Sequence, residues 1–165
     1  MKNFYIKQKV FSIGEKFTVK DASENICYRI QGSFFKVPKT FSIENVQGVE
    51  IATITKKILS LLPVFYVKIR GQEMIKIKKE LSLFKSNYSL SAHGLTVKGD
   101  WWDMDFDIQK NRRKVGSVRK KWFSWGDSYE VSVFDESLEE LIIALVIAID
   151  CVKADEQAAA SSAST

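Results

Sequence analysis

The chain has 165 residues, of which 45% are hydrophobic and 27% are charged, and its formal net charge at pH 7 is +5. This composition is that of an ordinary globular protein, and it excludes an intrinsically disordered chain, which would be poorer in hydrophobic residues. The only two cysteines, Cys27 and Cys151, exclude a disulfide-dense secreted scaffold and indicate a reduced, cytoplasmic setting.

Alternating hydrophobic and polar residues, typical of strands with one buried face, dominate the chain from its N-terminus onward. Short connections such as His93-Gly94 favour antiparallel hairpins, and they make His93, the sole histidine, a turn residue rather than a base. The predicted strands are 4–9, 15–21, 26–32, 40–46, 50–57 and 64–70, followed by 74–79, 86–92, 95–100, 104–110, 114–122 and 128–134.

The two sets of strands resemble each other, which predicts an internal duplication covering residues 4–70 and 74–134. The alternation breaks at residues 51–54 and again at the matching residues 115–118, which predicts a β-bulge in both halves. Features shared by the halves serve the fold, so features present in one half are the better candidates for function. The matching segments are 32–35 (GSFF) with 99–102 (GDWW), 51–57 with 115–121, and 65–69 with 129–133.

The pattern changes to a helix after the last strand. Ser137-Leu138-Glu139-Glu140 has the form of a capping box, and residues 141–149 that follow are hydrophobic on every side. The predicted helix, 138–153, is shorter than the roughly 20 residues that cross a bilayer, so we expect it to fill a barrel, with a membrane anchor as the competing interpretation. Residues 1–153 are predicted to form a single domain, and residues 154–165 a disordered tail.

These motifs, in this order, resemble the tubby-like fold. The chain is similar to the LURP-one-related proteins and their small bacterial relatives of the YxjI type, which share ancestry with phospholipid scramblases. The resemblance implies a mainly β fold, a closed antiparallel barrel of about twelve strands in two similar six-strand halves around a buried C-terminal hydrophobic helix. It implies no established catalytic site, so it transfers architecture rather than function. The segments that carry it are 32–35, 99–103, 115–122 and the helix from Ser137, within residues 4–153.

Positive charge is concentrated in residues 108–125, which contain seven basic residues and no acidic one, whereas the rest of the chain has 18 basic and 20 acidic residues. Residues 110–114 have no basic counterpart in the first half, while Lys120 and Lys121 match Lys56 and Lys57. The pattern predicts a surface that binds an anionic ligand; the alternative is a solvated hairpin whose cations offset neighbouring aspartates. The candidate residues are Lys110, Arg112, Arg113, Lys114, Arg119, Lys120 and Lys121.

Three aromatic residues, Trp122, Phe123 and Trp125, follow this basic segment and match the hydrophobic connection 58–63 of the first half. One interpretation is that both connections plug an end of the barrel. The other is that they protrude into a lipid interface, where Trp rings are favoured.

Asp103, Asp105 and Asp107 alternate along a predicted strand, which places their carboxylates on one face. They do not form a calcium loop of the EF-hand type, because Ile108 stands where glycine is required. We expect them to pair across the strands with residues 113–119, although whether they bind a cation stays open. The sequence predicts no metal site, cofactor site or catalytic residue.

The function predicted from these features is a non-enzymatic binding or scaffold module. Its predicted partner is an anionic phospholipid, or another phosphate-bearing partner, bound peripherally at the inner face of the membrane through the basic hairpin. The alternatives are a nucleic-acid-binding protein that stacks bases on Trp122 and Trp125, or a barrel that binds an uncharacterised small molecule. No transmembrane segment is expected, and the oligomeric state stays open.

Overall fold

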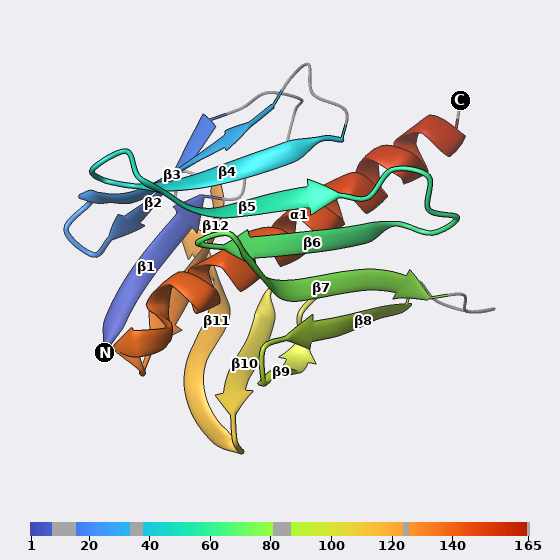
Figure 1. The fold of residues 1–165 in the computed structure, drawn as a ribbon. Helices are drawn as coiled ribbons and strands as arrows, with labels where there is room; N and C mark the ends of the chain where they lie inside the picture. The colour runs from blue at the N-terminus through green and yellow to red at the C-terminus, as the bar shows by residue number, and fades with distance from the viewer. Residues whose placement is uncertain (8–15, 34–37, 81–86, 124–125, 165) are drawn as a thin grey trace.

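The computed structural model describes residues 1–7, 16–33, 38–80, 87–123 and 126–164. Twelve antiparallel strands form a closed barrel in chain order, with β1 paired to both β2 and β12 (Figure 1). The predicted barrel of two sets of six strands is confirmed. The strands are β1 (Lys2–Lys7), β2 (Lys16–Asp21), β3 (Ile26–Gly32), β4 (Thr40–Asn45), β5 (Glu50–Lys56), β6 (Val64–Ile69), β7 (Gln72–Glu80), β8 (Asn87–Ala92), β9 (Leu95–Asp100), β10 (Asp105–Lys110), β11 (Arg113–Phe123) and β12 (Gly126–Val133).

The predicted bulges lie at matching positions in the two halves. Between β4 and β5, Ile43 pairs with Ala52 and the next pair is Glu44 with Glu50, so Ile51 is the extra residue. The corresponding shift between β10 and β11 leaves Val115 as the extra residue. Ile51 and Val115 are both buried, so each bulge turns one additional hydrophobic side chain into the core.

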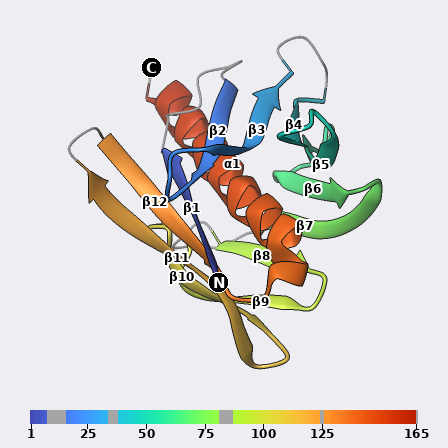
Figure 2. The same ribbon diagram turned by 90° about the vertical axis from the view of Figure 1, so that its left-hand side faces the viewer.

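A single helix, α1 (Glu139–Ala163), passes through the barrel (Figures 1 and 2). Residues 141–152 are all buried, because strands surround the helix and leave it no solvated face. The helix lies closest to β5, β6, β7 and β12. Among the described residues, no helix combines the length and the hydrophobicity needed to span a membrane.

The start of the helix differs from the predicted capping box. A short 3-10 turn, η1 (Glu136–Leu138), comes first, and the Asp135 side chain accepts hydrogen bonds from the backbone N–H and the hydroxyl of Ser137. Ser137 is therefore not the cap of α1: the N-cap position is Leu138, which makes no side-chain hydrogen bond to the helix. Glu139 binds Lys2 and the Tyr28 hydroxyl, and Glu140 binds Arg70, so both glutamates join the first helical turn to the barrel wall.

The end of the helix also differs from the prediction, because α1 continues to Ala163 where a disordered tail was expected. Two ion pairs hold its first turn beyond the core to the barrel wall, Lys56 with Asp155 and Lys79 with Glu156. The alanines that follow have the highest intrinsic helix propensity, which favours continuation of the helix over the expected disordered tail.

The strands run alternately up and down, so their connections gather at two ends of the barrel. We call the end where α1 begins the entry end; it carries the short connections 22–25, 46–49, 70–71, 93–94 and 111–112. We call the opposite end, where α1 leaves the barrel, the exit end; it carries the connections 57–63 and 101–104. The predicted turn at His93-Gly94 is confirmed, and both residues have positive φ, as a tight hairpin turn requires.

Candidate functional site

The seven basic residues predicted to bind an anion lie along the β10–β11 hairpin, which runs from one end of the barrel to the other. An antiparallel strand rises about 3.4 Å per residue, so Arg113 near the entry end and Lys121 toward the exit end lie about 27 Å apart. The structure therefore divides these cations instead of gathering them into one patch. Lys110, Arg112, Arg113 and Lys114 lie at the entry end, Lys120 and Lys121 lie toward the exit end, and Arg119 lies between.

Most of these cations already have acidic partners. At the entry end, Arg113 pairs with Asp135 at 2.8 Å and Lys114 with Asp107 at 2.9 Å. Farther along β11, Arg119 pairs with Asp107 and Asp105, and Lys121 lies 3.8 Å from Glu130. These contacts support the interpretation that the cations offset neighbouring carboxylates.

Two of the three predicted strand aspartates are confirmed in cross-strand pairing, while Asp103 lies in the connection 101–104 instead of in β10. Partial burial alone would raise the pKa of Asp107, but its contacts with Lys114 and Arg119 hold that pKa below the usual value. Arg119 also donates hydrogen bonds to the backbone carbonyls of Phe106 and Val118, which fix its position on the barrel wall. Within the described residues, no cluster of His, Cys, Asp and Glu has the arrangement of a metal site.

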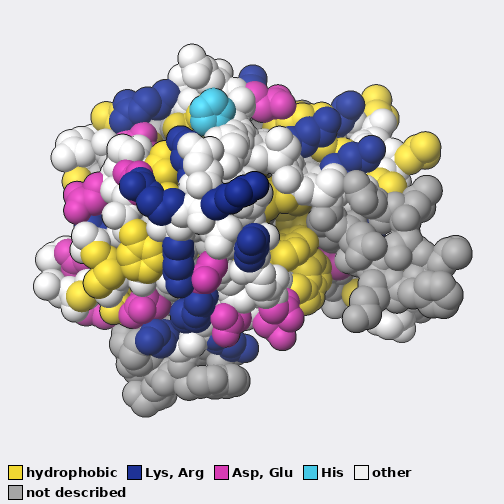
Figure 3. Space-filling view, turned by 90° about the horizontal axis from the view of Figure 1, so that it is seen from below, with side chains coloured by type: hydrophobic (Ala, Val, Ile, Leu, Met, Phe, Trp, Pro, Cys, Tyr) yellow, Lys and Arg dark blue, Asp and Glu magenta, His cyan; other side chains and the backbone are white. Residues whose placement is uncertain are grey.

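The hairpin tip keeps two cations without an acidic partner among the described residues, Lys110 and Arg112. Arg112 is exposed, and both Asn111 and Arg112 have positive φ, the conformation of a two-residue turn that non-glycine residues adopt at a cost. Figure 3 views the molecule from below and shows Lys and Arg side chains across the middle of that face, with Asp and Glu side chains among them. The charge on this face is mixed rather than uniformly positive.

The exit end carries a hydrophobic protrusion that we call the leucine loop, residues 57–63. Leu59 and Leu61 are fully exposed, at 100% and 104%, and Ile58 is 44% exposed. The loop is closed at its base by a hydrogen bond of 2.7 Å from the backbone N–H of Lys57 to the carbonyl of Val64. The expectation that this connection plugs the barrel is wrong for Leu59 and Leu61, because α1 already occupies the interior that they would have filled.

The matching aromatic connection of the second half cannot be compared in the same way. Trp125 lies outside the described residues, as do the side chains of Trp122 and Phe123 at the end of β11. The three aromatic candidates therefore stay a prediction, whereas Leu59 and Leu61 emerge as surface residues that sequence reasoning weighed only as part of a hydrophobic connection. The sequence signal that could have identified them is the pair of leucines that follows Lys57 in a connection between two strands.

A buried polar cluster lies inside the barrel near the exit end. Asp150 of α1 is only 4% exposed, and burial raises its pKa to about 6, opposed by Lys153 and by the Tyr129 hydroxyl. Burial likewise lowers the pKa of Lys153, which neighbouring carboxylates partly offset. The Tyr129 hydroxyl lies close enough to this carboxyl for the two groups to shift each other's pKa, but it has no well-formed hydrogen bond with any described residue. With a pKa of about 6, the buried Asp150 carboxyl can lose its proton near neutral pH.

Comparison with known proteins identifies relatives along almost the whole chain. A family model described as LURP-one-related matches residues 2–150. The uncharacterized protein YxjI of Bacillus subtilis (strain 168) is 30% identical over 149 residues, which cover 90% of this chain and 91% of that protein. The X-ray structure of the Arabidopsis thaliana protein AT5G01750 superposes with a TM-score of 0.58 over 90% of this chain and 91% of that chain, at 12% sequence identity. At that identity, the likeness to the solved structure shows a common fold alone.

Proposed function

The chain belongs to the LURP-one-related family, and from this premise and the surface described above we propose that it is a non-enzymatic module that binds anionic membranes peripherally. The leucine loop at the exit end is the part that enters the lipid interface. The proposal keeps the phospholipid partner expected from the sequence but moves the main contact away from the basic hairpin.

The exposure of Leu59 and Leu61 carries this proposal. Moving a leucine side chain fully from water into a nonpolar environment is favourable by about 1.5–3 kcal/mol, and here nothing in the described structure covers either side chain. Leu59 also has a φ of 57°, a conformation that bulky residues rarely adopt, so the backbone holds this side chain outward at a cost. A strained, exposed leucine is difficult to explain as a feature of the fold alone.

Basic residues at the exit end supply attraction to an anionic surface. Lys57 is exposed at the base of the leucine loop. Lys120 and Lys121 lie toward the same end of the barrel, but on β11, across the barrel from the loop, and Lys121 is paired with Glu130. Each Lys or Arg close to an anionic leaflet contributes about 1 kcal/mol, so a few of them with two leucines give reversible binding. The paired cations at the entry end contribute less, because Asp107 and Asp135 already neutralise Lys114 and Arg113. The same pairing weakens the nucleic-acid alternative.

Sedimentation with vesicles tests the proposal. We expect the full chain to pellet with vesicles containing phosphatidylserine and to stay in the supernatant with phosphatidylcholine vesicles at physiological salt. Replacing both leucines, Leu59→Asp with Leu61→Asp, should lower the apparent affinity about tenfold or more, which corresponds to the loss of about 1.4 kcal/mol or more. Equal recovery with both kinds of vesicle would refute the proposal.

The chain offers a matched control at the opposite end. Val46 and Val49 are 49% and 51% exposed in the β4–β5 connection, so Val46→Asp with Val49→Asp makes the same chemical change at the entry end. This control should bind vesicles like the wild type. A second comparison, Lys110→Glu with Arg112→Glu, tests the hairpin tip; if only this variant loses binding, the entry end is the membrane contact and the leucine loop is not.

A further inference from the structure

A groove of about 450 Å³ lies on the outside of the barrel along β1 and β2, with Ser128 of β12 in its wall. Its surface is mostly nonpolar, with Tyr5 and Phe17 among the lining residues. The volume falls within the range of about 300–1,000 Å³ that small-molecule sites occupy. The groove is lined by the first two strands and by the last strand of the chain, so no local sequence motif predicts it.

The groove is built on the paired part of β1 and β2. Three pairs are described there, Phe4 with Asp21, Tyr5 with Lys20 and Ile6 with Val19. This register places Tyr5 of β1 beside Lys20 of β2, and both residues line the groove.

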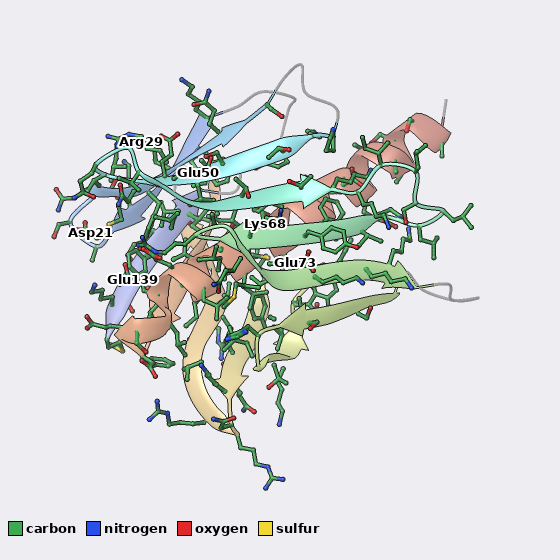
Figure 4. The ribbon with its side chains drawn as sticks, in the orientation of Figure 1. Asp21, Arg29, Glu50, Lys68, Glu73 and Glu139 are labelled. Carbon is green, nitrogen blue, oxygen red and sulfur yellow. The ribbon has the colours of Figure 1, made fainter. Side chains whose placement is uncertain are left out.

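The two ends of the groove carry opposite charges. Lys7 at the end of β1 and Lys16 at the start of β2 line one end of the groove, and Lys16 is exposed without an ion pair among the described residues. The other end, beside the β2–β3 connection, carries Asp21, labelled in Figure 4, and Glu24. Lys20 is already paired with Glu24 at 2.8 Å. One end therefore attracts an anion and the other repels it, which favours a ligand with a single anionic group over a polyphosphate.

Two hydroxyl groups add polarity to the nonpolar wall. The Tyr5 hydroxyl is hydrogen-bonded to the Glu130 carboxylate, which raises the pKa of Tyr5 and holds the ring in place. The Ser128 side chain is 7% exposed, and its hydroxyl has no hydrogen-bond partner in the part of the chain that the structure describes. Buried hydroxyls are normally hydrogen-bonded, so a free one in the wall of a groove is available to a ligand oxygen after a small rotation.

From this combination we infer that the groove binds a single-chain carboxylic acid amphiphile, of the size of a fatty acid, with its carboxylate at Lys16 and its chain along Tyr5 and Phe17. The lysine offers a charge-assisted contact at one end, and the nonpolar wall accepts the hydrocarbon. This site is separate from the leucine loop, so the inference does not depend on the proposed membrane contact.

Titration of the full chain with the fluorescent fatty acid cis-parinaric acid, below its micellar concentration, tests the inference, with competition by oleate. We expect saturable binding that oleate displaces. Lys16→Glu removes the anion contact and should weaken binding about tenfold or more, the effect of losing one hydrogen bond to a charged group. Thr18→Trp fills the groove from the outer face of β2 and should weaken binding by a similar or larger factor.

The matched control is Lys68→Glu, the same charge reversal on the outer face of β6, four strands around the barrel from β2 (Figure 4). It should bind the probe like the wild type. The inference is overturned if the wild type shows no saturable binding, if Lys16→Glu and Thr18→Trp bind normally, or if oleyl alcohol competes as well as oleate. Competition by inorganic phosphate would also overturn it, because it would reveal an anion site that needs no hydrocarbon. The Leu59→Asp, Leu61→Asp variant should retain probe binding, which separates this test from the vesicle experiment.

Discussion

The two halves of the barrel are alike inside and different outside. Both place a bulge at the same position, with Ile51 and Val115 turned into the core. On the outer face, the position where Asp107 forms an ion pair with Lys114 in the second half carries a hydrogen bond from Ser42 to Glu50 in the first. A duplicated barrel must preserve the side chains that meet the shared helix, whereas side chains facing water tolerate exchange. We therefore expect functions specific to this chain at the outer-face positions where the two halves differ.

The halves also differ at two internal points. Tyr129 of the second half corresponds to Phe65 of the first, so only the second half brings a hydroxyl to the buried Asp150. Gly99 corresponds to Gly32, but only Gly99 has a positive φ, of 118°. These differences make the comparison testable by substitution.

The largest expected effect comes from the helix that both halves share. Leu145 is completely buried, so Leu145→Asp places an unpaired charge in the core. That costs several kcal/mol, while the total stability of a domain is about 5–15 kcal/mol, and both halves should unfold together. Ala159→Asp, on the exposed part of the same helix, should leave the fold intact. Circular dichroism and gel filtration measure both variants; native spectra for Leu145→Asp would mean that the barrel does not depend on its helix.

A chain ending before Ser137 extends this prediction, because it removes the helix entirely. Such a chain should aggregate, since the emptied barrel would expose buried residues such as Phe106, Ile108 and Val131. Recovery of a folded product with the strand content of the full chain would contradict it.

The second effect distinguishes the two glycines. A Cβ on Gly99 would lie 2.8 Å from the backbone oxygen of Asp105, and its positive φ adds strain, so Gly99→Ala should cost about 2–4 kcal/mol. Among the described residues, a Cβ on Gly32 would meet only the ring of Phe41, at 3.1 Å, and this side chain can shift, so Gly32→Ala should cost less than about 1 kcal/mol. The midpoints of denaturant unfolding measure both. Equal costs in the two halves would remove the distinction.

The third effect is a pH dependence arising from Asp150. An aspartate with a pKa near 3.9 when unfolded and about 6 when folded binds its proton more tightly in the folded state. Its contribution to stability is therefore present below about pH 4 and is lost as the pH rises through about 6, amounting to about 2–3 kcal/mol at 1.4 kcal/mol per pKa unit.

Asp150→Asn removes this titration. The free energy of unfolding of Asp150→Asn minus that of the wild type should rise between about pH 4 and about pH 7.5 by a similar amount. Denaturant unfolding at both pH values measures it, and Tyr129→Phe, which makes the second half like the first, serves as the companion variant. A difference that stays constant with pH would show that Asp150 titrates alike in the folded and unfolded states.

The smallest effect concerns the outer face. Asp107→Asn leaves Lys114 and Arg119 without their shared partner, but the site is partly exposed, so the cost at neutral pH should stay below about 1 kcal/mol. Because the pKa of Asp107 is lowered in the folded state, this cost is fully present above its unfolded pKa and is lost as the pH falls through its folded pKa. High salt should also reduce the cost, whereas Ser42→Ala in the first half should show no salt dependence. Unfolding at low and high salt checks both.

Much of the fold was predictable from the sequence because it rests on local patterns. Two-residue alternation located the strands to within a few residues, and the repeated break at residues 51–54 and 115–118 indicated a bulge in each half without placing it. The stretch 141–149 predicted a helix buried on every side, since no solvated surface could accept it. The pairing of Asp105 and Asp107 with Arg119 also followed from neighbouring strands.

The candidate site was predictable only as a set of residue types. Seven cations in one segment predicted a surface, but a strand as long as β11 spreads its residues over both ends of the barrel. Whether the connection 57–63 folds inward or outward depended on the space inside the barrel, which α1 fills. The pairing of each cation likewise depended on which carboxylate the register placed opposite it.

The sequence by itself determined the alternation, the duplication and the hydrophobic helix, because each is a property of residues close together in the chain. Tertiary structure alone decided the groove, which needs β1, β2 and β12 side by side, and the continuation of α1 to Ala163, which Lys56 and Lys79 hold from distant strands. It also decided the environment of Asp150, whose raised pKa follows from burial by the whole barrel. Contacts between distant segments depend on closure of the sheet, and no local sequence pattern determines that closure.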